Sequence, residues 1–178
     1  MSKINLNDMC LDDTSEFIKE SKLKIEQNSE VVENLVKDII SNCCSELDNY
    51  VAYVKSIIAE DSSSVPTELL EDMTLALPTL LYQVGDMSEL IGVKEDIAKA
   101  VKQELYNTIM ETGEGKSTDK KIRAELETQS ESLALVIYQR AYKSIKLKTD
   151  FGLELLQSVK KILSKRISEL ELSKNTRS

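Results

Sequence analysis

Residues that interrupt helices are scarce in this chain. It contains two prolines and five glycines in 178 residues, and aromatic side chains make up only 4% of the sequence. Sheet proteins need Pro and Gly for turns and aromatic side chains for their cores, and the abundant Leu, Ile, Lys, Glu and Ser of this chain leave little room for them. We therefore expect an all-α protein in which long amphipathic helices form a bundle or coiled-coil arrangement, and we expect it to be oligomeric.

Two polar stretches divide the chain. Residues 60–66 include three consecutive serines and residues 111–117 include two glycines, so both are predicted to be linkers. We expect the last two segments together, residues 66–173, to form one domain. The three predicted segments are an acidic N-terminal helical extension (1–62), a kinked helical segment (66–112) and a basic helical segment (117–173).

The first segment carries a weak seven-residue repeat. Asp13 and Glu16 have the spacing of a capping box and predict the start of a helix. Apolar residues then recur at intervals of seven, although polar residues occupy several positions that a firm coiled coil fills with Leu. The repeating residues are Ile18, Ile25, Val32 and Ile39.

Prolines mark two points in the second segment. Pro66 suits the first turn of a helix, because the N–H that proline lacks has no partner there. Pro78 lies inside an apolar run, where a proline costs a helix about 3 kcal/mol and predicts a kink or a break. Beyond it, apolar residues spaced four apart predict one helical face. They are Ile97, Val101, Leu105 and Ile109.

The third segment separates apolar from basic residues with a helical period. Ala141 and Ile145 fall on one side of the predicted helix, and basic side chains fall on roughly the opposite side. Residues 149–152 predict a mild interruption or a hairpin turn. The apolar repeat that follows needs a partner helix, in the same chain or in another subunit, and we assign it to an oligomer interface. Its residues are Leu156, Val159, Leu163 and Leu170.

Charge is distributed unevenly along the chain. Residues 1–115 carry 9 basic and 23 acidic residues, a net charge of −14, whereas residues 116–178 carry 14 and 8, a net charge of +6. A basic tract with interleaved aromatic residues is typical of a surface that follows a polyanion. The alternative is a solvated helix face that the acidic half neutralises. The candidate nucleic-acid-binding residues are Arg140, Lys143, Lys146, Lys148, Lys160, Lys161, Lys165 and Arg166, with Tyr142 as the candidate for base stacking.

Catalysis is not expected, and neither is a metal or a cofactor. The chain has no His, which removes the commonest general base and the commonest metal ligand. Residues 113–118 lack the earlier glycine and the preceding strand that a phosphate-binding loop needs. Three cysteines, two of them adjacent, make no disulfide framework, and no stretch has the apolar length of an export signal or a membrane span. We therefore expect a non-enzymatic cytoplasmic protein that does not bind membranes.

Between about residues 70 and 170, several features follow one another along the chain. A Leu-Leu-Tyr string precedes a helix, a glycine loop, a second helical block and a closing pattern of Lys, Ser and Arg. These features are residues 80–82, 94–106, 113–115, the block with Tyr142 and Leu147, and residues 158–166. This layout resembles that of the UvsY-type recombination mediators of T-even-like phages, and it leaves about the first 65 residues without a counterpart.

The resemblance implies a helical protein that assembles into a ring-like oligomer and binds single-stranded DNA. It implies two protein partners, a RecA-type recombinase and the single-strand-binding protein that covers the strands to be loaded, and it implies the host cytoplasm as location. Gln103, Glu104 and Asn107 stand where the family carries basic residues, so that DNA contact is not transferred to this chain. A nucleic-acid surface here rests on the basic tract.

Two other functions are compatible with the same residues. An acidic helical inhibitor or scaffold that binds a basic protein accounts directly for the charge of the first 115 residues. A virion or assembly component would use the apolar stripes for contacts with its own copies. The three functions differ in what the chain binds: single-stranded DNA and a recombinase, one basic protein, or mainly itself.

Overall fold

The computed structural model describes residues 6–61 and 64–175, with side chains described at positions 23 and 26 and over residues 28–59 and 64–173. Within these residues the chain forms four helices and no strand: α1 (Leu6–Asp61), α2 (Thr67–Thr112), α3 (Ser117–Glu127) and α4 (Gln129–Asn175). The predicted all-α fold is thus confirmed. Over the described residues, no helix combines the length and the apolar character that a membrane span requires.

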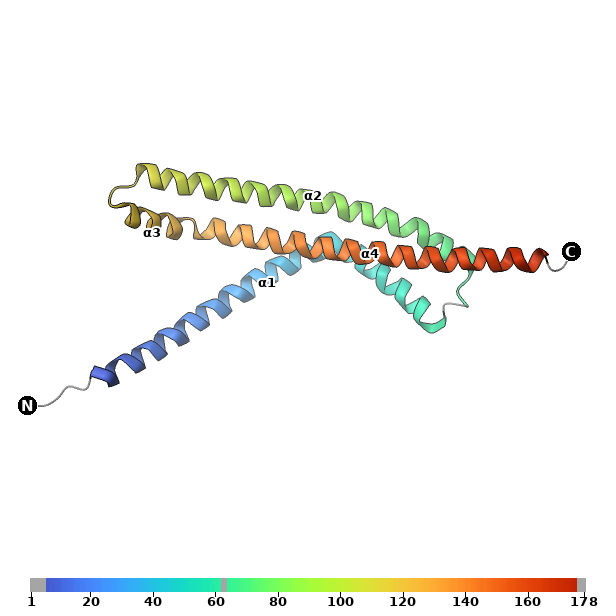
Figure 1. Ribbon diagram of the computed structural model, residues 1–178, viewed down its shortest axis with the longest axis horizontal. Coiled ribbons are helices and arrows are strands. Elements are labelled where there is room, and N and C mark those ends of the chain that lie inside the picture. Colours follow the sequence, from blue (N-terminus) through green and yellow to red (C-terminus); the bar gives the residue numbers. More distant parts are fainter. Residues whose placement is uncertain (1–5, 62–63, 176–178) are drawn as a thin grey trace, which may run out of the picture.

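α2 and α4 lie side by side and form a long antiparallel hairpin (Figure 1). α2 begins directly after Pro66, as predicted, and residues 113–116 connect it to the short α3. Gly115 in this loop has a φ of 108°, which lies in the left-handed region that residues with a Cβ rarely adopt. Glycine therefore permits the tight reversal that sends α4 back along α2.

One hydrophobic core joins α2 and α4 with the second half of α1. Cys44, Leu47 and Val54 of α1 are at most 1% exposed. The segment predicted as an N-terminal extension is therefore only partly an extension, because its second half helps to build the core. The core residues are Cys44, Leu47, Val54, Val65, Leu70, Met73, Leu77, Leu81, Val84, Ile91, Ala141, Ile145, Leu156 and Val159.

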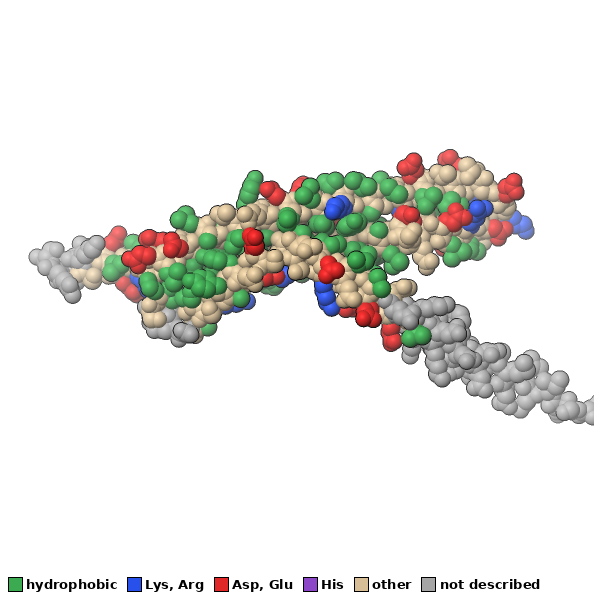
Figure 2. Space-filling view, turned by 180° about the vertical axis from the view of Figure 1, so that it is seen from behind, with side chains coloured by type: hydrophobic (Ala, Val, Ile, Leu, Met, Phe, Trp, Pro, Cys, Tyr) green, Lys and Arg blue, Asp and Glu red, His purple; other side chains and the backbone are tan. Residues whose placement is uncertain are grey.

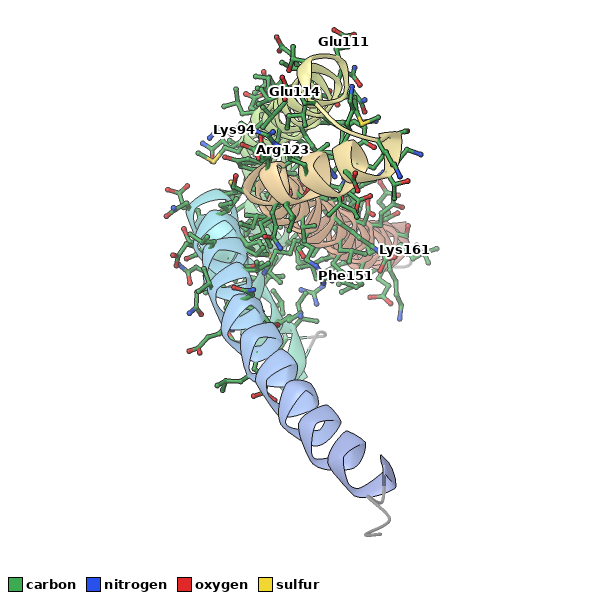
Figure 3. The ribbon with its side chains drawn as sticks, turned by 90° about the vertical axis from the view of Figure 1, so that its left-hand side faces the viewer. Lys94, Glu111, Glu114, Arg123, Phe151 and Lys161 are labelled. Carbon is green, nitrogen blue, oxygen red and sulfur yellow. The ribbon has the colours of Figure 1, made fainter. Side chains whose placement is uncertain are left out.

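The first half of α1 extends away from the hairpin (Figures 1 and 3). The helix already includes Leu6, so the start predicted at Asp13 and Glu16 is wrong. Ile18 and Ile25 of the predicted repeat lie outside the residues whose side chains are described. Further along, Val32 and Ile39 are half-buried, and Ile39 packs against the core.

Both long helices of the hairpin pass through the interruptions that their sequences predict. α2 continues through Pro78, whose ring is exposed, so a break there is wrong. α4 continues through residues 149–152, so the predicted interruption or hairpin turn is also wrong. A Cβ added to Gly152 would lie 2.7 Å from Cδ2 of Leu81, which shows that this glycine lets α4 approach α2 closely.

The real interruption lies earlier, between α3 and α4. Thr128 separates the two helices and is 1% exposed. Its side-chain hydroxyl donates to the carbonyl oxygen of Ala124 over 2.8 Å, and its own carbonyl accepts from the hydroxyl of Ser132 over 2.8 Å. The buried hydroxyl is thereby hydrogen-bonded within its own turn. No helix boundary was predicted at this position.

Candidate nucleic-acid interface

The basic residues of α4 form two groups on its surface. The proximal cluster is defined by Arg140, Lys143 and Lys146, and the distal cluster by Lys160, Lys161, Lys165 and Arg166. All are exposed except Arg166, which is half-buried. Ala141 and Ile145, which follow Arg140 by one and five positions, are 0% exposed. The helical period therefore keeps the proximal cluster on the solvent side while its neighbours fill the core.

The two clusters are separated along the helix. At about 1.5 Å per residue, Lys146 and Lys160 lie about 21 Å apart along the axis. Asp150 and Glu154 lie between them and are exposed. The basic face is therefore two short stretches of positive charge with an acidic midpoint, not one continuous stripe.

The acidic first half of the chain leaves most of this face uncovered. Nζ of Lys148 lies 2.7 Å from each carboxylate oxygen of Asp48, which joins α4 to α1. Because this pair occupies Lys148 within the molecule, we remove Lys148 from the candidate nucleic-acid contacts. By contrast, five basic residues have no acidic partner within ion-pair distance among the described residues: Arg140, Lys143, Lys146, Lys160 and Lys161.

The predicted stacking residue Tyr142 faces α2. It is half-buried and packs against the core, and its ring would lie 3.6 Å from a Cβ added to Gly92. Phe151 is instead 65% exposed on α4, between the two clusters. Figure 3 shows Phe151 and Lys161 projecting outward from α4. The prediction missed Phe151 because residues 149–152 were expected to form a mild interruption or a hairpin turn.

A groove lies where the first half of α1 diverges from α4. Its volume is about 780 Å³, and Arg140 and Lys143 of the proximal cluster stand in its wall. Apolar side chains from both helices form much of the lining, and the polar part includes Glu33 and Lys37 of α1. The apolar members are Val32, Val36, Leu133, Val136 and Leu147. The proximal cluster therefore borders an apolar recess, whereas no comparable recess was predicted from the sequence.

The predicted oligomer interface on α4 is largely internal. Leu156 is 7% exposed and Val159 is 0% exposed, so both pack inside the chain and their assignment to an intersubunit contact is wrong. Leu163 is half-buried and also packs against the core. Leu170 alone of the four is substantially open, at 49% exposed. The partner helices that the apolar repeat required are thus α1 and α2 of the same chain.

Cys44, the buried thiol of α1, is poorly reactive. Burial, with the nearby charge of Asp48 as a second cause, raises the pKa of Cys44 from 9.0 to about 11. A thiol with so high a pKa is a poor nucleophile at neutral pH. Within the described part of the chain, no group of three His, Cys, Asp or Glu residues is arranged to hold a metal ion.

No protein-family model, curated protein sequence or solved structure matches this chain. The resemblance to the UvsY-type mediators therefore stays a prediction. The geometry of α4 and of its groove is what bears on function.

Proposed function

We propose that the chain binds single-stranded DNA along α4 and acts as a recombination mediator that assists loading of a RecA-type recombinase onto strands covered by single-strand-binding protein. The observation that carries this proposal is the open basic face: Arg140, Lys143 and Lys146 are exposed on one helix, and none has an acidic partner among the described residues. The mediator role itself rests on the resemblance in layout.

The phosphates of the strand lie against the proximal and distal clusters, and apolar contacts form in the stretch of α4 between the two clusters. Lys and Arg release counterions when they neutralise phosphates, which supplies most of the affinity. Phe151 offers an exposed ring for one base between the clusters. The acidic segment does not prevent this, because at physiological salt its charges are screened beyond about 8–10 Å.

The experiment is a fluorescence anisotropy titration of a labelled single strand and a matched duplex at several salt concentrations. A variant with Arg140→Gln, Lys143→Gln and Lys146→Gln should bind the single strand at least about tenfold more weakly near physiological salt. The slope of log affinity against log salt should fall by about 2, because each lost phosphate contact removes about 0.7. Circular dichroism should show unchanged helicity, since all three residues are exposed.

The matched control carries Lys99→Gln, Lys116→Gln and Lys121→Gln, which are exposed and lie outside α4. It loses the same three charges, so binding that depends on the proximal cluster should stay close to the wild-type value. Equal losses in both triple variants would mean that overall charge, not this face, governs binding. No binding of wild-type protein at any salt would refute the proposal and leave the basic-protein partner as the function to pursue.

The mediator role needs its own measurement. Recombinase filament formation, followed by its DNA-dependent ATPase on strands already covered by single-strand-binding protein, should become faster when wild-type protein is added. The proximal triple variant should lose most of this stimulation. If the wild-type protein binds single strands but leaves the ATPase lag unchanged, DNA binding stands and the mediator role is refuted.

A further inference from the structure

One side of α2 is apolar and open to solvent. Six large side chains lie along it, and we call them the outer row: Leu75, Tyr82, Leu90, Val93, Ile97 and Val101, which are 71%, 72%, 63%, 51%, 57% and 47% exposed. At about 1.5 Å per residue, the row extends about 39 Å along the helix. Figure 2 shows hydrophobic side chains gathered along the edge of the molecule that α2 forms.

The row lies roughly opposite the face of α2 that builds the core. Leu77, Leu81 and Val84 are at most 7% exposed on that inner face. The period of the helix also explains why the predicted face from Ile97 to Ile109 is not one face. Residues four apart rotate by about 40° per step, so the series begins exposed at Ile97 and ends at Ile109, which is 7% exposed.

Scattered exposed apolar residues are ordinary, but six large ones along the same side of one helix mark an interaction surface. We propose that the outer row is the interface between two copies of this chain, with the two α2 helices parallel and related by a two-fold axis. Leu90, Val93 and Ile97 have the three- and four-residue spacing of a coiled-coil seam. This inference goes beyond the proposed function and does not depend on nucleic-acid binding.

Charges beside the row select a second copy and a parallel orientation. If Leu90 and Ile97 take the a positions of a heptad and Val93 the d position, Glu89 is at g and Lys94 is at e. Both are exposed, and neither has an ion-pair partner among the described residues. In a parallel pair the g side of each helix faces the e side of the other, so Glu89 of each copy meets Lys94 of its partner.

An antiparallel pair would bring like charges together. In that orientation each g side faces the g side of the other copy, and Glu89 and Asp96 share that side of α2 at exposed positions. Like charges across a helix pair are destabilising. The charges that flank the row thus provide two attractive contacts in the parallel orientation and repulsion in the antiparallel one.

The area is sufficient for a weak dimer. Burying an aliphatic side chain removes on the order of 60–120 Å² from water, and the row contributes roughly half to three quarters of that for each of six residues. The two copies together would bury about 400–1,100 Å², which is below the size of a standard specific interface and fits a weak, transient one. We therefore expect a concentration-dependent dimer, not a permanent one.

Asp86 limits this dimer. It is exposed and lies on the same side of α2 between Tyr82 and Leu90. In the parallel pair it faces Asp86 of the partner subunit, where two carboxylates repel. Replacing it with Asn should therefore strengthen self-association several-fold, which is an unusual direction for a surface substitution.

The first test is sedimentation equilibrium of the full chain over a wide concentration range. Wild-type protein should show a reversible monomer–dimer equilibrium, and a Leu90→Asp, Ile97→Asp variant should raise the dimer dissociation constant at least about tenfold. The matched control is Ile122→Asp with Leu126→Asp, two residues of α3 that are 55% and 64% exposed. The control should dimerise like the wild type. A wild-type monomer at several hundred micromolar, or equal effects of both variants, would overturn the proposal.

The second test addresses orientation by exchanging the flanking charges. Glu89→Lys and Lys94→Glu should each weaken the dimer several-fold, and the double variant should recover the wild-type dissociation constant. Asp86→Asn should strengthen the dimer. Failure of the double variant to recover, together with no gain from Asp86→Asn, would overturn the parallel arrangement even if the outer row proves to be the interface.

Discussion

α2 and α4 are nearly equal in length, at 46 and 47 residues, and they share one core, yet their outer sides differ. α2 presents an apolar row flanked largely by carboxylates, whereas α4 presents lysine and arginine. Their inner sides follow one rule, which is that large aliphatic residues recur with the helical period. The outer sides are not constrained by that core, so the two helices can differ there.

The difference between inner and outer sides has its largest expected effect at two leucines of α4, one buried and one exposed. Leu156→Ala removes a side chain that is 7% exposed, and it should lower the free energy of unfolding by about 2–5 kcal/mol. Leu170→Ala, at a position 49% exposed, should change it by less than about 0.5 kcal/mol. Urea denaturation at low protein concentration measures both. Similar losses for the two variants would mean that Leu170 is buried by a contact with another molecule.

Two glycines offer a second contrast between inner and outer sides. Gly152→Val should destabilise the protein by about 1–3 kcal/mol, because its Cβ would meet Leu81 at 2.7 Å inside the hairpin. Gly85 has nothing within 4 Å of an added Cβ, so Gly85→Ala should stabilise α2 by about 0.5–1 kcal/mol. Thermal denaturation followed by circular dichroism reports both signs. A stabilising Gly152→Val would show that α4 and α2 are not in close contact there.

The same contrast explains what the sequence could predict. The inner sides were predictable, because a residue such as Ile145 has to pack and its spacing shows where. Helix continuity at Pro78 and Gly152 was not predictable, because tertiary packing holds the helix through residues of low helical propensity. The proline ring points to solvent and the glycine admits a neighbouring helix.

The candidate site was predictable only in part. A helical wheel correctly placed Arg140, Lys143 and Lys146 on the exposed side of α4. It failed for Lys148, Tyr142 and Leu156, since each of these depends on where α1 and α2 lie against α4. The side of α4 that is buried could be predicted from its own sequence. The helices that pack against that side could not.

Lys148 is a basic residue of α4 that forms an ion pair with α1. Its substitution tests whether this internal ion pair and single-strand binding are independent. Its Nζ lies 2.7 Å from Asp48, and the two side chains are 35% and 44% exposed. Solvent screening keeps such a pair modest, so Lys148→Gln should cost about 0.5–1 kcal/mol. Single-strand binding should stay unchanged. A loss of binding comparable with that of the proximal triple variant would return Lys148 to the nucleic-acid surface.

The smallest expected effect is on the pKa of Cys44, whose thiol is influenced by the charges of Asp48 and Lys148. Burial, with the charge of Asp48 as a second cause, raises the pKa of Cys44 from 9.0 to about 11, and the charge of Lys148 opposes this shift. Because the folded pKa exceeds the unfolded one, the stability that this thiol contributes is full below about pH 9 and is lost as the pH rises toward 11. Asp48→Asn should therefore lower the pKa of Cys44, and Lys148→Gln should raise it. Thiolate absorbance in a Cys10→Ser, Cys43→Ser background, with Cys44→Ala subtracted, measures both shifts. Shifts of the same sign in the two variants would mean that the ion pair acts on Cys44 through packing and not through charge.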